Sequence, residues 1–351
     1  MSETILRFGV IGAGRMGALH ARVLSEMAGV DLAGVVDTDG GKAKQVAEKF
    51  GCQALEGLDD LKDIDAAVVA VPTSHHLPVA LKLLAQGIHL LVEKPLAGEV
   101  AAGEQMLRAA GKAGVLLQVG HTERFNPIVW SLQSQPIEAK FIECQRVSPF
   151  SFRSMDIGVV LDMMIHDIDI VQKLAGAEVK DVQAVGVNVM GETEDVANVR
   201  LRFANGCVAN LTASRLALKT DRRIRVFSSD AYLSLNFQGK NGIVVRKNPN
   251  LDLVRILAEQ RQAGQLSDIT QLDWTGMIQV EEMPISDHEP LVKQAECFCE
   301  SIREGTPPVV SGEDGLENIR LAHRILSAIK AHRWDGTPTG RVGLGDHLGG
   351  N

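Results

Sequence analysis

The chain has 351 residues, which suits about two domains, and its 45% hydrophobic and 23% charged residues exclude disorder, collagen and coiled coil for the bulk of it. The net charge of −8 argues against a nucleic-acid partner, and no apolar run approaches the roughly 18 residues of a membrane span. Five cysteines without a C-x-x-C pair, and a start without signal-peptide features, predict reduced thiols in a cytoplasmic protein.

The first third of the chain alternates short apolar segments with helical ones. We expect strands at 5–11, 32–36, 66–71, 88–92 and 115–119, and helices at 18–26, 76–86 and 99–112. The strands are continuously apolar, which is typical of a sheet covered on both faces. Strands that alternate with helices predict a doubly wound parallel sheet, here over residues 1–122.

Farther along, the hydrophobic pattern becomes alternating. Residues 199–203 read Val-Arg-Leu-Arg-Phe, a half-buried strand, and Asn205-Gly206 after them predicts a type I′ hairpin. We expect further strands at 207–213, 224–227, 232–237 and 243–246, and helices at 158–175, at 290–304 and from Ser311 to about 331. This pattern predicts a second α/β domain over 123–335 with a large, open, mostly antiparallel sheet, and a loose tail at 336–351.

A glycine-rich loop lies between the first predicted strand and the first helix. Its pattern, Gly12-x-Gly14-x-x-Gly17, predicts dinucleotide binding in this context. Gly12 permits the tight turn, Gly14 lets the backbone approach a pyrophosphate, and Gly17 lets the helix pack closely. Asp37, 20 residues past Gly17, is placed to accept bonds from ribose hydroxyls and would repel a 2′-phosphate. The pattern therefore favours NAD over NADP, and the alternative is a glycine turn without a ligand.

A second motif, Glu93-Lys94-Pro95, follows the strand at 88–92. Ligands bind beyond the carboxyl ends of strands in open α/β sheets, so Lys94 is aimed at the same crevice as the glycine loop. A desolvated lysine can orient a substrate hydroxyl or share its proton. The alternative is a solvated surface lysine paired with Glu93.

The helix expected at 158–175 is apolar almost all round, which is typical of a buried helix. Asp162, His166 and Asp169 nevertheless share one face of it, and buried titratable groups are costly unless paired or used. Asp162 could hold the His166 ring while His166 accepts a hydroxyl proton near neutral pH. The alternative is a self-satisfied core pair. We predict no metal here, because no other His or Cys has ligand spacing to this face.

In this order the motifs resemble the Gfo/Idh/MocA oxidoreductase family. The resemblance rests on AGRMGALH at 13–20, VPTSHH at 71–76, EKP at 93–95, the D-x-x-x-H helix at 162–166 and VSGEDGLENIRLA at 310–322. It implies a Rossmann domain that binds NAD and a second domain whose open sheet makes homo-dimer or homo-tetramer contacts. It also implies a catalytic pair, Lys94 and His166, with Asp162 in support. The cofactor contacts that it implies come from Gly12, Gly14, Arg15, Met16, Gly17, Asp37, Pro72, His76 and Glu93.

Two further segments narrow the resemblance. GHTERFNP at 120–127 and RVSPFSFRSMDIG at 146–158, where many relatives carry a triple glycine, are similar to the branch that oxidises UDP-N-acetylhexosamines such as UDP-N-acetylglucosamine at carbon 3. This branch implies a 3-keto product for a partner aminotransferase, in one version within lipid A biosynthesis. Arginines supply the bidentate donors that a diphosphate needs. The substrate contacts expected besides Lys94, Asp162 and His166 are Arg124, Asn126, Arg146 and Arg153.

Two other functions stay open. One keeps the chemistry but changes the substrate to a free sugar or an inositol, a neutral polyol that needs no diphosphate-binding arginines. The other is a non-enzymatic NAD-binding sensor or regulatory subunit, because a fold does not fix a function.

Overall fold

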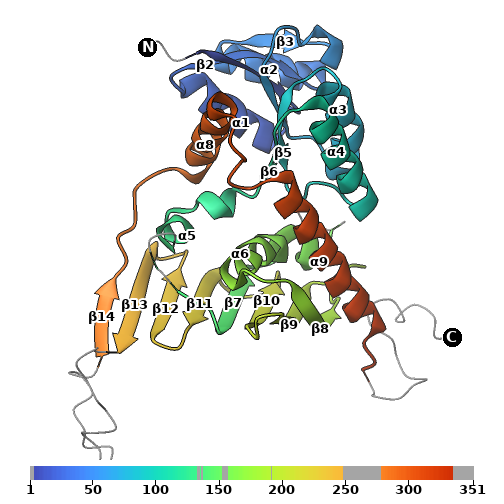
Figure 1. The fold of residues 1–351 in the computed structure, drawn as a ribbon. Coiled ribbons are helices and arrows are strands. Elements are labelled where there is room, and N and C mark those ends of the chain that lie inside the picture. Colours follow the sequence, from blue (N-terminus) through green and yellow to red (C-terminus); the bar gives the residue numbers. More distant parts are fainter. Residues whose placement is uncertain are drawn as a thin grey trace, which may run out of the picture.

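The computed structural model describes residues 4–132, 135, 137–151, 157–190, 192–247 and 278–334. Arg153 and the predicted tail at 336–351 lie outside the described residues. Figure 1 shows the N-terminal sheet with its helices above a broad second sheet, with α6 (Ile165–Ala175) lying between the two.

The first sheet has six strands in the order β3-β2-β1-β4-β5-β6, and every described pair of them is parallel. The strands are β1 (Leu6–Ile11), β2 (Val30–Val36), β3 (Gln53–Leu55), β4 (Ala66–Val69), β5 (His89–Glu93) and β6 (Leu117–Gly120). The helices are α1 (Arg15–Glu26), α2 (Gly40–Phe50), α3 (His76–Leu84) and α4 (Val100–Ala113). The doubly wound parallel sheet is confirmed. Its strand order reverses between β1 and β4, where such folds bind ligands.

The second sheet has eight strands in the order β14-β13-β12-β11-β7-β10-β9-β8. They are β7 (Phe141–Val147), β8 (Val179–Val187), β9 (Val196–Phe203), β10 (Val208–Ser214), β11 (Asp221–Phe227), β12 (Ala231–Asn236), β13 (Asn241–Lys247) and β14 (Ile278–Glu282). Of the described strand pairs, only β7 with β10 is parallel, so the mostly antiparallel sheet is confirmed.

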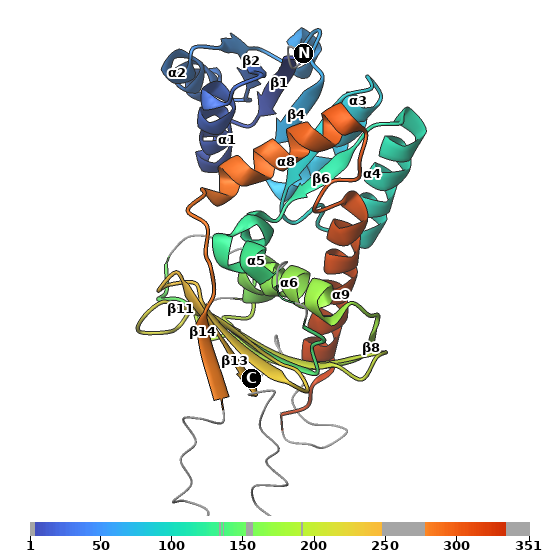
Figure 2. The same cartoon turned by 60° about the vertical axis from the view of Figure 1, so that its left-hand side comes forward.

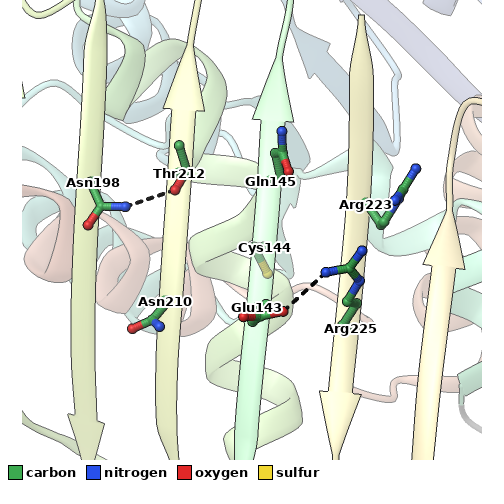
Figure 3. Close-up of a pocket in the computed structure, with 8 residues that line it drawn as sticks. All are labelled: Glu143, Cys144, Gln145, Asn198, Asn210, Thr212, Arg223 and Arg225. Carbon is green, nitrogen blue, oxygen red and sulfur yellow. Dashed lines mark hydrogen bonds and ion pairs between the residues drawn. The ribbon is translucent and has the colours of Figure 1, made fainter.

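One face of the second sheet carries the core, and the other is open and polar. Buried residues alternate with partly exposed ones along β10, as the sequence predicted for a half-buried sheet. Figure 3 shows the open face, where Asn198 donates to Thr212 and Arg225 donates to Glu143 across a shallow depression of about 260 Å³.

The hairpin between β9 and β10 lies where Asn205-Gly206 predicted it, but its turn is not type I′. The loop is 204–206, closed by the pair Phe203–Cys207, and within it only Gly206 has a positive φ, +86°. A type I′ turn needs positive φ at both central residues. The Asn205 side chain donates to the Ala175 carbonyl oxygen at 2.8 Å, which favours this longer loop.

The helices of the second domain also differ in one respect from the prediction. They are η3 (Thr122–Phe125), α5 (Pro127–Ser131), η5 (Val160–Met164), α6, α8 (Pro290–Glu304) and α9 (Gly312–Ala331). The helix expected at 158–175 is present, but its first part, η5, is a π-helical turn. The capping box at Ser311 is confirmed, since the Ser311 side chain accepts from Asp314 N and the Asp314 side chain accepts from Ser311 N.

The helix α8 packs on the first domain, although it lies within the range expected for the second. Figure 2 shows it across the upper part of the molecule, beside α1. The Phe298 ring meets the Phe8 ring edge to face at 6.2 Å between centroids, and Phe298 is fully buried. After α8 the chain runs along β6, where Val119 N donates to the Val310 carbonyl oxygen at 3.0 Å. The first domain's core is therefore completed from the far end of the chain.

Candidate active site

Two cavities lie at the carboxyl ends of the first sheet's strands. One, of about 550 Å³, is lined by Gly12, Gly14, Asp37, Pro72 and His75 among others. The second, of about 380 Å³, is lined by Met16, Glu93, Lys94, Asn126 and His166 among others. The structure therefore gathers most of the predicted site residues into two cavities at this edge of the sheet, both lined in part by the glycine loop or the start of α1.

The glycine loop fits a dinucleotide. Gly12 has φ +99°, and a Cβ there would lie 2.4 Å from the Ala70 carbonyl oxygen, while a Cβ on Gly17 would lie 1.7 Å from the Gly12 carbonyl oxygen. A Cβ on Gly14 would meet no atom within 4 Å. Gly12 and Gly17 are thus required by the chain itself. At Gly14 the space in front of the N-terminus of α1 is open, so a pyrophosphate can approach the helix N–H groups.

Asp37 lies at the end of β2 and lines the larger cavity. Its Oδ2 accepts from Ala13 N at 2.6 Å and its Oδ1 accepts from Asp39 N at 2.8 Å. These bonds fix the carboxylate beside the glycine loop, and each oxygen keeps a lone pair for a ribose hydroxyl. Arg15, by contrast, begins α1 as an exposed residue and is not among the residues lining either cavity.

The two adjacent histidines of VPTSHH have different surroundings. The His76 ring is buried, with Nδ1 near the carbonyl oxygens of Pro95 and Leu96 and Nε2 near that of Val71. Burial lowers the pKa of His76. The His76 ring thus connects the segment after Lys94 to the start of α3. The exposed neighbour, His75, lines the larger cavity.

Glu93 ends β5 as a buried carboxylate that faces the smaller cavity. His20 Nε2 lies 2.7 Å from Glu93 Oε1, and Lys94 N donates to Glu93 Oε2 at 3.2 Å. Gly120 on the neighbouring strand leaves room for it, since a Cβ there would lie 3.1 Å from the Glu93 carboxyl group. Sequence reasoning expected a role for Glu93 but did not connect it with His20, which orients it from a position 73 residues earlier.

Lys94 pairs with Asp162 across the junction between the domains. Its Nζ donates to the Asp162 carbonyl oxygen at 2.9 Å and to Oδ1 at 3.3 Å. No described hydrogen bond joins Asp162 to His166, whose Nδ1 is buried without a partner. The expected support of His166 by Asp162 assumed an α-helix, in which residues four apart face the same way, and the π-helical turn of η5 alters that spacing.

The surroundings of His166 keep its ring neutral. Burial lowers the pKa of His166 well below its ordinary value of 6.5, and the cations Lys94 and Arg146 lower it further. His121 lies edge to face with His166 at 6.2 Å between ring centroids. His121 is itself buried, with its pKa lowered by burial and its Nε2 3.3 Å from the Asn318 amide nitrogen. A neutral imidazole that lines a cavity can accept a proton. The sequence did not single out His121, because its place in the segment at 120–127 does not indicate that it packs against His166.

Two of the arginines expected to contact a diphosphate are paired with carboxylates of α6. Arg124 Nε donates to Asp169 at 2.8 Å, and Arg146 donates to Asp167 from Nε at 3.0 Å and from Nη2 at 2.8 Å. All four side chains are buried. These pairs hold η3 and β7 against α6. They also account for the buried carboxylate of Asp169, which accepts from Arg124 and from the Asn318 amide.

Asn126 lines the smaller cavity, as expected, and also caps α5. Its Nδ2 donates to Glu123 Oε2 at 3.3 Å.

Over the described ranges, no cluster of three or more His, Cys, Asp or Glu side chains has a geometry that could hold a metal ion. In that same part of the chain, no helix combines the length and apolarity needed to cross a membrane.

Comparison with known proteins matches both domains. The family model described as an oxidoreductase family with an NAD-binding Rossmann fold matches residues 6–121, and the model of the GFO/IDH/MocA C-terminal domain matches residues 138–234. UDP-N-acetylglucosamine 3-dehydrogenase from Acidithiobacillus ferrooxidans is 32% identical over 93% of this chain and 98% of its own length. A solved structure of that enzyme has a TM-score of 0.82, covering 92% of this chain and 97% of the other.

Other similar proteins are named for other substrates. Myo-inositol 2-dehydrogenase from Thermotoga maritima is 27% identical over 93% of this chain and 97% of its own. A levoglucosan dehydrogenase solved with NADH and L-sorbose has a TM-score of 0.78 at 19% identity, covering 93% of this chain and 97% of the other, and this likeness shows the fold alone.

Proposed function

The chain belongs to the GFO/IDH/MocA oxidoreductase family, and from this premise we propose that it oxidises the 3-hydroxyl of UDP-N-acetylglucosamine to the 3-keto sugar with NAD. At the coarser level the chain is an NAD-binding sugar dehydrogenase, so the alternative of a non-enzymatic regulator is not retained. The observation that carries the proposal is the meeting of Lys94 and His166 at one cavity, beside the glycine loop that fits a dinucleotide.

His166, Lys94 and Glu93 have separate roles in the proposed oxidation. NAD, when bound, supplies the acceptor for the hydride from carbon 3. Neutral His166 accepts the proton of the 3-hydroxyl at Nε2, since its other nitrogen is buried. Lys94, held by Asp162, donates a hydrogen bond to the same oxygen and stabilises the negative charge that develops on it. Glu93 keeps its position beside the reacting centre through His20.

The binding of NAD involves the loop residues in distinct ways. Gly14 and the first turn of α1 would hold the pyrophosphate, and Asp37 would accept from the ribose hydroxyls. Met16, Pro72 and Glu93 line the two cavities and would contact the nicotinamide half. His76, which the resemblance implies as a cofactor contact, is bonded to backbone carbonyls, so we assign that contact to His75, which lines the larger cavity.

A substrate panel tests the proposal. The purified chain is mixed with NAD and with UDP-N-acetylglucosamine, UDP-N-acetylgalactosamine, free N-acetylglucosamine or myo-inositol, and NADH absorbance is followed. We expect NADH with the UDP-sugars and much less with the free polyols. NADH from myo-inositol alone would replace the proposal with the second candidate, an inositol dehydrogenase, which relatives at 27% identity favour.

Three finer predictions accompany this function. The 3-keto product is an electrophile that an aminotransferase can convert to a 3-amino sugar, the step that lipid A diamino sugars require. We also propose a homo-dimer or homo-tetramer formed through the open face of the second sheet, and a place in the cytoplasm. Sedimentation of the purified chain measures whether it is a dimer or a tetramer. Incubation of the dehydrogenase together with an aminotransferase tests whether the 3-keto product is converted to the 3-amino sugar.

A further inference from the structure

We propose that Arg222, on β11, is the arginine that binds the diphosphate of the substrate, an inference that rests on the proposed function. No motif pointed to this residue, and the arginines that the motifs did suggest are either paired inside the protein or outside the described residues.

The side-chain alternation of β11 places Arg222 on the inner face of the second sheet. Ile224 and Val226, two and four residues later, are buried in the core of that face. Arg222 is also the cross-strand partner of Arg146 on β7, whose side chain reaches the carboxylates of α6. Its neighbour Arg223 belongs to the opposite, open face, where Figure 3 shows it beside Arg225.

Arg222 differs from Arg146 in what holds its guanidinium group. Arg146 is buried and makes several bonds to Asp167 and another to Glu123. Among the described contacts, the Arg222 guanidinium makes only one bond, of 3.5 Å, to Glu123, and the side chain is 45% exposed. A guanidinium has five N–H donors, so most of those on Arg222 remain available for phosphate oxygens.

Glu123 connects Arg222 to the reacting groups. Its carboxylate lines the same cavity as Lys94 and His166. Arg222 is also among the cations that lower the pKa of His166, which puts its charge within range of that ring. Carbon 1 of the sugar, which carries the diphosphate, is two bonds from carbon 3. Arg222 does not itself line this cavity, but it is bonded to Glu123 in the cavity wall. A cation just beyond the wall, near the catalytic pair, therefore matches the position that the diphosphate must take.

The negative charge of Glu123 does not oppose this role. Buried Arg146 neutralises it from one side, and Asn126 Nδ2 donates to its other oxygen. Glu123 instead orients Arg222 through their 3.5 Å bond, as a carboxylate commonly does for a ligand-binding arginine. In this arrangement Arg222 is a specificity residue: a neutral polyol gains nothing from it, whereas an anionic nucleotide sugar does.

Titration calorimetry of the full chain saturated with NADH, which cannot accept a hydride, tests the proposal, with UDP-N-acetylglucosamine and UDP as ligands. Arg222→Ala is expected to weaken binding of both ligands roughly 10- to 100-fold, the usual effect of losing hydrogen bonds to a charged group. Arg222→Lys should retain part of the affinity, because a lysine keeps the charge but not the planar fork. Arg108→Ala, which removes an exposed arginine of α4 paired with Glu104, is the control and should bind like the wild type.

The possible results separate the proposal from the function on which it rests. NAD affinity and melting temperature equal to those of the wild type show that Arg222→Ala is folded. If the wild type binds the UDP ligands and Arg222→Ala binds them equally well, Arg222 is not the diphosphate ligand, and the proposed function stands. If the wild type binds neither UDP ligand, both the assignment of Arg222 and the nucleotide-sugar function are overturned. If the wild type and the control variant bind the UDP ligands and Arg222→Ala does not, both the assignment of Arg222 and the nucleotide-sugar function are supported.

Discussion

Lys94 reaches from the end of β5 in the first domain to Asp162 in the second, where its Nζ donates to the main-chain carbonyl oxygen at 2.9 Å. The same ammonium group approaches the Asp162 carboxylate at 3.3 Å. The lysine that we assign to the substrate hydroxyl is therefore aimed by a helical turn of the other domain. Its position depends on how the two domains pack together.

Replacing either member of the catalytic pair should stop turnover without loss of cofactor binding. We expect Lys94→Ala and His166→Ala each to lower kcat for NADH formation by about 100-fold or more, since each removes proton transfer or charge stabilisation. NAD affinity, measured by fluorescence titration, should stay within about twofold, because neither residue lines the Asp37 cavity. Lys82→Ala, which removes an exposed lysine paired with Asp59, is the control. Turnover near that of the wild type in both variants would contradict the assignment.

The pH dependence of oxidation should reflect the lowered pKa of His166. The neutral ring is the proton acceptor, and burial with Lys94 and Arg146 nearby holds its pKa well below 6.5. The acid limb of kcat/KM for NADH formation should therefore lie below pH 6.5, with the rate still near its plateau at that pH. Initial rates between pH 5 and pH 9 measure it. A limb at or above the ordinary histidine pKa would show that His166 is protonated more easily than its surroundings imply.

Changing Gly14 or Gly17 to alanine should affect different properties of the protein. Gly17→Ala places a Cβ 1.7 Å from the Gly12 carbonyl oxygen, so it should lower the melting temperature as well as NAD affinity. Gly14→Ala meets no protein atom within 4 Å, so it should leave the melting temperature unchanged and weaken only NAD. Thermal melting with and without NAD distinguishes the two. A Gly14→Ala variant that binds NAD normally would argue against the pyrophosphate position.

The buried pair of Arg124 and Asp169 should contribute to stability and not to substrate affinity. Removing one partner of a buried ion pair costs about 3–5 kcal/mol, so Arg124→Met should lower the free energy of unfolding by that order. Urea denaturation gives the value, and Arg108→Met, from an exposed pair with Glu104, should change it by less than about 1 kcal/mol. A folded Arg124→Met protein with normal stability and weak UDP-sugar binding would restore the original expectation for this residue.

Stability should fall on acidification below about pH 6.5. His76, His121 and His166 all have their pKa lowered in the folded protein, first by burial. Their stabilising effect is fully present above the unfolded-state pKa near 6.5. Below it, the unfolded chain takes up protons that the folded chain does not, so the free energy of unfolding declines. Urea denaturation at pH 7.5, 6.5 and 5.5 should show this decline, and His121→Asn should reduce its slope.

The parts of the site that the sequence predicted well depend on local context. A strand, a glycine loop and a helix in succession determine where Gly12, Gly14 and Asp37 lie, and the end of β5 determines the place of Lys94. These positions follow from the direction in which strands and helices run. They need no knowledge of distant neighbours.

The parts that could not be predicted depend on contacts between distant segments or on small backbone irregularities. His20 and Glu93 are 73 positions apart, and the sequence contains no sign that they touch. The pairing of Arg124 with Asp169 required knowledge of how η3 packs on α6. Asp162 was expected to support His166, but one π-helical turn directs it to Lys94 instead. The spacing of residues along the sequence was interpreted for a regular α-helix, so it could not reveal where the π-helical turn directs Asp162.

The return of α8 to the first domain has a consequence for synthesis of the chain. Residues 1–122 leave the ribosome well before Phe298, which covers Phe8 in the finished protein. At about 5–20 residues per second, the nascent first domain waits about 10–40 s with part of its apolar surface uncovered. A fragment ending at residue 122 would keep that surface exposed permanently. Supplying residues 290–311 as a separate peptide should make such a fragment less prone to aggregate.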